Sequence, residues 1–249
     1  VAISRRGVSR KFQVPGIFPE LTVRQSIALP MVAASRNPTL ASLIWRKADP
    51  ARLAELLECL SADLKAVLVA PPGAGKTSRV PLALLGQPWA VNSKILVVQP
   101  RRLAARSAAH HMAHLLKEPV GKTIGYSVRM DSKVSAQTRI EFVTDGVFTR
   151  KIINDPELTG VAAVLFDEIH ERSLNMDLGL ALALDTANAL RSDLRLLPMS
   201  ATLDGANVAS LLAQVGEPPA KLVQSEGRTF PISYRYVPKT PNECIEDAM

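Results

Sequence analysis

A glycine-rich turn in the central part of the chain has the composition of a phosphate-binding loop. It has the sequence Ala70-Pro-Pro-Gly-Ala-Gly-Lys-Thr77, and Gly73 and Gly75 allow its backbone N–H groups to turn inward around a phosphate. Lys76 can reach the β- and γ-phosphates, and the Thr77 hydroxyl can bind Mg²⁺. An alanine stands where the full pattern has its first glycine, but an apolar strand before the turn and a helix after it compensate. The predicted nucleotide-binding residues of this loop are Gly73, Ala74, Gly75, Lys76, Thr77 and Ser78.

Two adjacent acids end an apolar segment further along the chain, in Val164-Leu-Phe-Asp-Glu-Ile-His170. A strand that ends this way can present a metal carboxylate beside the phosphates of a nucleotide. Asp167 is therefore predicted to bind Mg²⁺ together with Thr77, and Glu168 to polarise the water that attacks the γ-phosphate. An acid pair alone also fits an exposed charged turn. Its combination with the loop favours ATP hydrolysis, with Asp167, Glu168 and Lys76 as catalytic residues.

Alternating strands and helices must position these motifs. Continuous apolar runs predict strands that are buried on both faces, and longer stretches between them predict helices. The strands are expected at 66–70, 95–98, 161–166 and 194–199, and the helices at 51–60, 101–116, 146–153, 174–190 and 205–212. This alternation predicts parallel βαβ units with right-handed crossovers. Ligands collect at the carboxyl ends of such strands, which is where the motifs fall.

Several ordered segments of the chain resemble the motifs of superfamily 2 helicases. Asp167-Glu168-Ile169-His170, followed by Glu171-Arg172-Ser173, resembles the DExH box of the DEAH branch. The other matching segments are Gln99-Pro-Arg-Arg-Leu-Ala-Ala-Arg106 (motif Ia), Thr144-Asp-Gly-Val-Phe-Thr-Arg150 (motif Ib) and Ser200-Ala-Thr-Leu-Asp204 (motif III). Three more are similar to bacterial HrpB-type helicases in particular, namely Asp155-Pro-Glu-Leu158, Asp177-Leu-Gly-Leu-Ala-Leu182 and Ser225-Glu-Gly-Arg-Thr-Phe-Pro231.

The resemblance implies the first RecA-like domain of a P-loop ATPase, an α/β fold with a mostly parallel sheet and helices on both faces. It implies ATP and Mg²⁺ as ligands and single-stranded nucleic acid as a partner, RNA rather than DNA. In such motors a second RecA-like domain supplies arginine fingers, which contribute roughly 10³–10⁵ in rate. We therefore expect the chain to bind MgATP, to hydrolyse it poorly without the missing second domain, and to be a fragment of a longer motor.

The nucleic-acid contacts follow from the same resemblance. Arg101 and Arg102 in motif Ia, and Thr144 and the N–H of Gly146 in motif Ib, would contact the backbone of the single strand. Two cations at a helix N-terminus oppose the helix dipole, which favours a use outside the helix. The alternative for the two arginines is a solvated helix start.

Three further residues are expected to couple the two ligands. Ser200 and Thr202, with His170 as their neighbour, would relay the state of the nucleotide to the strand-binding surface. His111 stands where the DEAH branch has an arginine that stacks on adenine. Its ring is planar but only partly cationic at neutral pH, so weaker stacking is expected. Ile169 replaces the usual alanine of the branch.

Other sequence features exclude some classes of protein. His110, His111 and His114 suggest a metal site, but no third-ligand pattern accompanies them and surface histidines are the favoured interpretation. Cys59 and Cys244 are expected to be reduced thiols of a cytoplasmic protein. No apolar run approaches the roughly 18–20 residues that a membrane span needs.

The net charge of +7 lies entirely in one end of the chain. Residues 1–47 hold eight basic residues and one acid, and the rest of the chain holds 22 of each. We divide the chain into a basic segment 1–48, a RecA-like domain 49–236 and a linker start 237–249. The basic segment fits a targeting segment, a signal peptide with 27–34 as its apolar region, or a disordered or extraneous extension, which we favour.

Two other functions remain open. A different P-loop ATPase, such as a remodelling or transport ATPase, is disfavoured by motif Ia and by the Ser-Ala-Thr motif. The second is a catalytically silent module that binds nucleotide or RNA.

Overall fold

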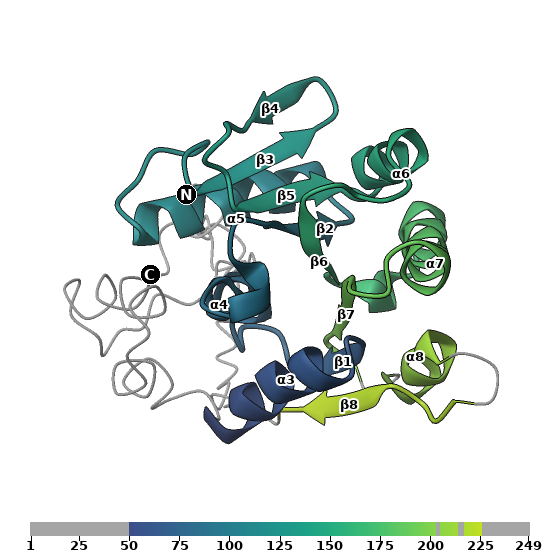
Figure 1. The fold of residues 1–249 in the computed structure, drawn as a ribbon. Coiled ribbons are helices and arrows are strands. Elements are labelled where there is room, and N and C mark those ends of the chain that lie inside the picture. Colours follow the sequence, from purple (N-terminus) through teal and green to yellow (C-terminus); the bar gives the residue numbers. More distant parts are fainter. Residues whose placement is uncertain (1–49, 203–204, 214–216, 226–249) are drawn as a thin grey trace, which may run out of the picture.

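The central part of the chain forms one open, eight-stranded sheet. The computed structural model describes residues 50–202, 205–213 and 217–225 (Figure 1). The predicted segments 1–48 and 237–249, Cys244 and most of the HrpB-like segment 225–231 therefore lie outside the described residues. The strands are β1 (Ala66–Val69), β2 (Lys94–Gln99), β3 (Ile124–Val128), β4 (Asp131–Lys133), β5 (Ile140–Thr144), β6 (Val161–Phe166), β7 (Arg195–Ser200) and β8 (Lys221–Gln224). The α-helices are α3 (Pro50–Ala62), α4 (Lys76–Leu85), α5 (Arg102–Leu115), α6 (Asp145–Asn154), α7 (Leu174–Ala189) and α8 (Gly205–Leu212).

The strand order across the sheet is β4-β3-β5-β2-β6-β7-β1-β8. All neighbouring strands are parallel except β3 and β4, which form an antiparallel hairpin. β1 lies between β7 and β8, so the first strand of the sheet pairs with the last two. The strands β1, β5 and β6 each have a neighbour on both sides and are buried along their whole length, as expected for parallel strands covered on both faces.

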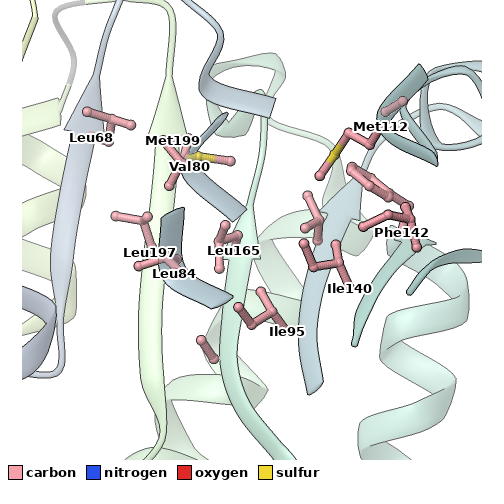
Figure 2. Close-up of a cluster of buried hydrophobic side chains, with 14 of the residues drawn as sticks. Leu68, Val80, Leu84, Ile95, Met112, Ile140, Phe142, Leu165, Leu197 and Met199 are labelled. Atoms are coloured by element: carbon pink, nitrogen blue, oxygen red, sulfur yellow. The ribbon is translucent and has the colours of Figure 1, made fainter. Parts of the chain in front are cut away.

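Two layers of helices cover the sheet. Side chains of α3, α4 and α5 pack with one set of strand residues, and side chains of α6, α7 and α8 pack with the other set. Figure 2 shows part of the first cluster, in which Leu84 of α4 and Met112 of α5 pack with strand residues such as Leu165. Burying an aliphatic side chain of this size contributes about 1.5–3 kcal/mol, so the two clusters fix the positions of the strand ends.

The predicted α/β fold, with a mostly parallel sheet and helices on both faces, is confirmed. The four predicted strands correspond to β1, β2, β6 and β7, and the predicted helices to α3, α5, α6, α7 and α8. The prediction missed β3, β4, β5 and β8. β5 contains Glu141, the second residue of the strand, which is buried and forms an ion pair of 2.9 Å with Lys151 of α6. A buried acid interrupts the apolar run, so a search for continuous apolar runs does not detect the strand.

Candidate nucleotide and nucleic-acid site

Five adjacent parallel strands bring the predicted motifs to one edge of the sheet. In spatial order, β5 ends at Thr144, β2 at Gln99, β6 at Phe166, β7 at Ser200 and β1 at Val69. Motifs Ib and Ia thus lie on one side of the acid pair, and motif III and the phosphate loop lie on the other. The acid pair follows β6, the middle one of these five strands, and therefore lies between the two groups of motifs.

The phosphate loop joins β1 to α4 through two glycines in the left-handed region. Gly73 has a φ of 81° and Gly75, which precedes the first residue of α4, has a φ of 86°. A side chain at either position would be strained. A Cβ atom on Gly75 would also lie 2.8 Å from the Cδ atom of Arg79, so this side chain would have to move as well.

Lys76 is a buried cation close to both acids. Its Nζ atom donates hydrogen bonds to the carbonyl oxygens of Ala70 and, at 3.4 Å, Pro71. Burial lowers the pKa of Lys76, and the negative charges of Glu168 and Asp167 act against that shift. Lys76 is the first residue of α4, and its ammonium group reaches back to the start of the loop, close enough to interact with the charges of both acids.

Asp167 is fully buried and accepts hydrogen bonds on both oxygens. Its Oδ2 atom accepts from the Thr77 hydroxyl and, at 2.7 Å, from Nε2 of Gln99, and its Oδ1 atom accepts from the backbone N–H of Glu168 at 3.0 Å. Burial raises the pKa of Asp167, and the hydrogen bond from Thr77 and the charge of Lys76 oppose that rise. A carboxylate beside a hydroxyl is a set of hard oxygen ligands that fits Mg²⁺. The contact between Thr77 and Asp167 brings the two predicted metal ligands together.

Glu168 and His170 form the second half of the acid motif. Glu168 has a left-handed backbone with a φ of 55°, which is uncommon for a residue other than glycine and is concentrated at functional sites. Burial raises the pKa of its carboxyl group, and the charge of Asp167 raises it further. The Glu168 Oε2 atom lies 3.5 Å from Nδ1 of His170.

His170 also contacts motif III. The backbone N–H of Ala201 donates to Nδ1 of His170 at 3.3 Å, and the Thr202 N–H donates to Oγ of Ser200 at 3.1 Å. The Ser200 carbonyl accepts from the N–H of Ala70 at 3.0 Å. Motif III therefore lies between the acid motif and the phosphate loop, a position consistent with the predicted relay, which stays a prediction.

The predicted nucleic-acid residues lie on the other side of the acid pair. Arg101 and Arg102 are both exposed at the start of α5, and a guanidinium nitrogen of Arg101 lies 3.0 Å from Oε1 of Glu171. The Gly146 N–H, which was predicted to contact the strand, donates to Oδ1 of Asp145 at 2.7 Å. Thr144 is buried directly before α6. None of these positions tests a contact with nucleic acid, so the four assignments stay predictions.

The histidines of α5 are separate from this row of strand ends. His111 is half-buried, and burial together with the charge of His114 lowers its pKa. The lowered pKa favours the neutral ring at neutral pH, and the stacking of His111 on adenine stays a prediction. The ring of His110 packs against that of Tyr126. Among the described residues, no group of three or more His, Cys, Asp or Glu side chains is arranged to hold a metal ion.

Gln99 is the site residue that the sequence reasoning missed. It entered the prediction only as part of motif Ia, but its side chain is buried and bonds directly to Asp167. A signal for it was present in the sequence. Gln99 is a polar residue at the carboxyl end of a continuous apolar strand, as Asp167 is one position past the end of another, and parallel strands place such ends together.

Comparisons with known proteins agree with the motifs. The family model described as DEAD/DEAH box helicase matches residues 53–211. The chain is 49% identical over 197 residues to the ATP-dependent RNA helicase HrpB of Escherichia coli, covering 79% of this chain and 24% of that protein. It is 37% identical over 183 residues to the DExH-box ATP-dependent RNA helicase DExH1 of Arabidopsis thaliana, covering 72% of this chain and 18% of that protein.

Solved structures give the same answer for the fold. A crystal structure of the Escherichia coli DEAH/RHA helicase HrpB matches 80% of this chain and 24% of that chain, with a TM-score of 0.68 and 49% identity. The chain thus spans about a quarter of the length of these bacterial relatives. Within the described ranges, no helix is both long enough and apolar enough to cross a membrane.

Proposed function

Because the chain belongs to the DEAD/DEAH box helicase family, we propose that it is the first RecA-like motor domain of an ATP-dependent RNA helicase. In this role it binds MgATP and a single strand of RNA, and it hydrolyses ATP when a second RecA-like domain completes the site. Residues 49–236 form the motor domain, preceded by the basic segment 1–48 and followed by a linker start at 237–249. Relatives that are named ATP-dependent RNA helicases support RNA as the strand.

The observation that carries this proposal is the contact between Thr77 and Asp167. It joins the phosphate loop on β1 to the acid pair on β6, two strands that are separated by β7. A glycine-rich turn or an acid pair alone also fits an ordinary surface turn. A hydroxyl from the loop bonded to a fully buried carboxylate is an arrangement that suits a metal-bound nucleotide.

The described residues divide the chemistry of hydrolysis among them. The backbone N–H groups of the loop and the Lys76 ammonium bind the phosphates, and Thr77 and Asp167 hold Mg²⁺. When bound, Mg²⁺ neutralises charge on the β- and γ-phosphates. Glu168 orients the attacking water and accepts its proton. The raised pKa of Glu168 makes it a stronger base than an exposed glutamate.

The strand-binding residues are proposed to act on the other side of the acid pair from the phosphate loop. Arg101 and Arg102 donate charge-assisted hydrogen bonds to phosphates of the RNA backbone. Such contacts carry no sequence information, so binding by this domain should be tolerant of sequence and sensitive to salt.

The first test is nucleotide binding by the Lys76→Ala variant. A hydrogen bond from a charged donor contributes about 1.5–3 kcal/mol, so the affinity for MgATP should fall by about 10–100-fold. Isothermal titration calorimetry on the wild-type chain and the variant measures the change directly.

Lys122→Ala is the matched control, since Lys122 is an exposed lysine that pairs with Glu118 on the surface. This control should bind MgATP as the wild type does. Equal affinities of the wild type and Lys76→Ala would contradict the assignment of the phosphate loop.

A further inference from the structure

We propose that Gln99 is a positioning residue for the metal site, and that it links this site to the segment that contacts RNA. The inference rests on the proposed function and names a connection inside that site. Its side-chain amide holds the carboxylate of Asp167 in place, and its backbone continues directly into Pro100, Arg101 and Arg102.

The position of Gln99 in the sheet places it beside Asp167. Gln99 is the last residue of β2, and β2 pairs with β6 so that Val98 lies opposite Phe166. The ladder continues one step further, since the N–H of Asp167 donates to the Val98 carbonyl at 2.9 Å. The Gln99 side chain is 3% exposed, and Nε2 donates to Oδ2 of Asp167 at 2.7 Å.

The chemistry of an amide suits this place. Asp167 is fully buried, and its carboxylate accepts hydrogen bonds from Thr77, Gln99 and the Glu168 N–H. Together these bonds fix the orientation of the carboxylate. A neutral amide donates to the carboxylate without bringing a positive charge that would compete with a metal ion. Outer contacts of this kind orient a ligand and tune its affinity for the metal.

Two contacts join the segment 99–102 to the acid motif, and the residues that make them are separated by a single residue. Gln99 bonds to Asp167, and Arg101 pairs with Glu171 at 3.0 Å, in the turn that follows the acid pair. Pro100 stands between them, and its fixed φ leaves little freedom in the connection. An RNA phosphate that draws Arg101 away from Glu171 therefore acts on the same short segment that holds the metal carboxylate.

Two variants break the bond in different ways. Gln99→Met keeps the approximate length of the side chain and removes the amide, and Gln99→Asn keeps an amide on a side chain too short to reach Asp167. Thr186→Val is the control for stability. Thr186 of α7 is also buried and donates a hydrogen bond to the Pro156 carbonyl, and neither residue belongs to the motifs of the site.

The first measurement is the affinity for a non-hydrolysable ATP analogue, with Mg²⁺ and with EDTA. In both Gln99 variants the affinity with Mg²⁺, divided by the affinity in EDTA, should fall by about 10-fold. The affinity in EDTA should stay that of the wild type. Thr186→Val should keep the wild-type ratio. The proposal requires the fall in both variants; a fall in one alone, or in neither, would overturn it.

The second measurement tests the link to RNA. Binding of a fluorescent single-stranded oligouridine should differ with and without the Mg²⁺-bound analogue in the wild type, and both Gln99 variants should reduce that difference towards none. A wild type that binds both ligands without mutual effect would overturn the link. If the wild type binds no MgATP, the proposed function itself fails. If the wild type shows Mg²⁺-dependent binding of the analogue and the Gln99 variants show the same dependence, only the role of Gln99 is refuted.

Discussion

Two adjacent acids in one turn are held in different surroundings, and the difference fits the two roles that we propose for them. Asp167 is fully buried and accepts three hydrogen bonds, which suits a carboxylate that stays ionised at a metal. Glu168 lies next to His170 in a partly buried position, and its pKa is raised by burial and by the charge of Asp167. Burial raises the pKa of both carboxyl groups, so the two acids differ in their hydrogen bonds rather than in the direction of their pKa shifts.

The Glu168→Gln variant tests the role of the second acid. The amide keeps the shape of the side chain but cannot accept a proton from the attacking water. In a protein extended by a matching second RecA-like domain, single-turnover hydrolysis should fall by about 10²–10⁴-fold, while ATP binding is retained. An unchanged rate in the extended variant would remove Glu168 from the mechanism.

At the residue scale, the sequence predicted the ligands but not their supports. Lys76, Thr77, Asp167 and Glu168 could be found because each belongs to a pattern of residue types with a known chemical use. Gln99 could not be found in this way, because a glutamine next to a proline has no specific chemistry. Its role depends on the register of β2 against β6, and register is set by the packing of the whole sheet.

The start of α8 is the tightest contact between a helix and the sheet among the described glycines. A Cβ atom on Gly205 would lie 2.5 Å from Cγ2 of Val69 and 2.7 Å from Cδ1 of Leu222. Gly205→Ala should therefore lower the free energy of unfolding by about 1–3 kcal/mol, because buried Val69 in β1 has little freedom to move. Urea unfolding measures the change.

Gly146→Ala in α6 is the matched control, since nothing lies within 4 Å of its added methyl group. An alanine in this helix should leave stability unchanged or raise it by up to about 1 kcal/mol. If Gly205→Ala is as stable as Gly146→Ala, the described packing of α8 on β1 is wrong.

The turn between α7 and β7 contains an ion pair whose contribution to stability depends on pH. Arg191 donates to both carboxylate oxygens of Asp193 and to the carbonyl oxygens of Glu157 and Val161, before and at the start of β6. The hydrogen bond from Arg191 lowers the pKa of Asp193 below its ordinary value of 3.8. An acid whose pKa is lowered in the fold stabilises that fold when the pH is above the ordinary pKa of the acid. This contribution to stability is lost as the pH falls through the lowered pKa.

Asp193→Asn should therefore lower the melting temperature at pH 7, and the difference from the wild type should shrink below pH 3.8. Asp193 is largely exposed, so the contribution is at most about 1 kcal/mol, or about 2–4 °C for a domain of this size. Thermal unfolding by circular dichroism over a pH series is the measurement. A difference that is the same at every pH would show that the Asp193 carboxylate does not carry this stabilisation.

Element prediction succeeded where burial is purely apolar and failed where polar groups are buried in pairs. The strands β1 and β6 are continuous apolar runs and were found. β5 was missed because Glu141 interrupts it, and the partners of that acid, Lys94 and Lys151, come from β2 and α6. β4 and β8 are short strands with mostly exposed residues, whose existence depends on pairing with a neighbour.

For the molecule as a whole, the basic charge and the predicted strand-binding residues are separate. The excess of basic residues lies in 1–47, and Arg101 and Arg102 lie in a part of the chain with no net charge. Deleting residues 1–48 should weaken RNA binding and reduce its dependence on salt, because fewer counterions are released, and should leave MgATP affinity unchanged. RNA binding titrated over a salt series gives the slope before and after deletion.

Replacing Arg101 and Arg102 by alanine in the shortened chain should reduce the remaining slope further, by about 0.7 for each RNA phosphate that is no longer neutralised. If the slope of the shortened chain does not change with this replacement, the two arginines do not contact the strand.

The place of β1 in the sheet has a consequence for how the chain is made. β1 leaves the ribosome before any other strand of the sheet, yet Leu68 pairs with Met199 in β7 and with Val223 in β8. Translation at about 5–20 residues per second separates these strands by on the order of ten seconds. During that interval the strand that precedes the phosphate loop is an apolar segment with neither neighbour. The nascent chain should therefore need chaperones most before β7 and β8 emerge, and premature termination within that window should yield aggregates.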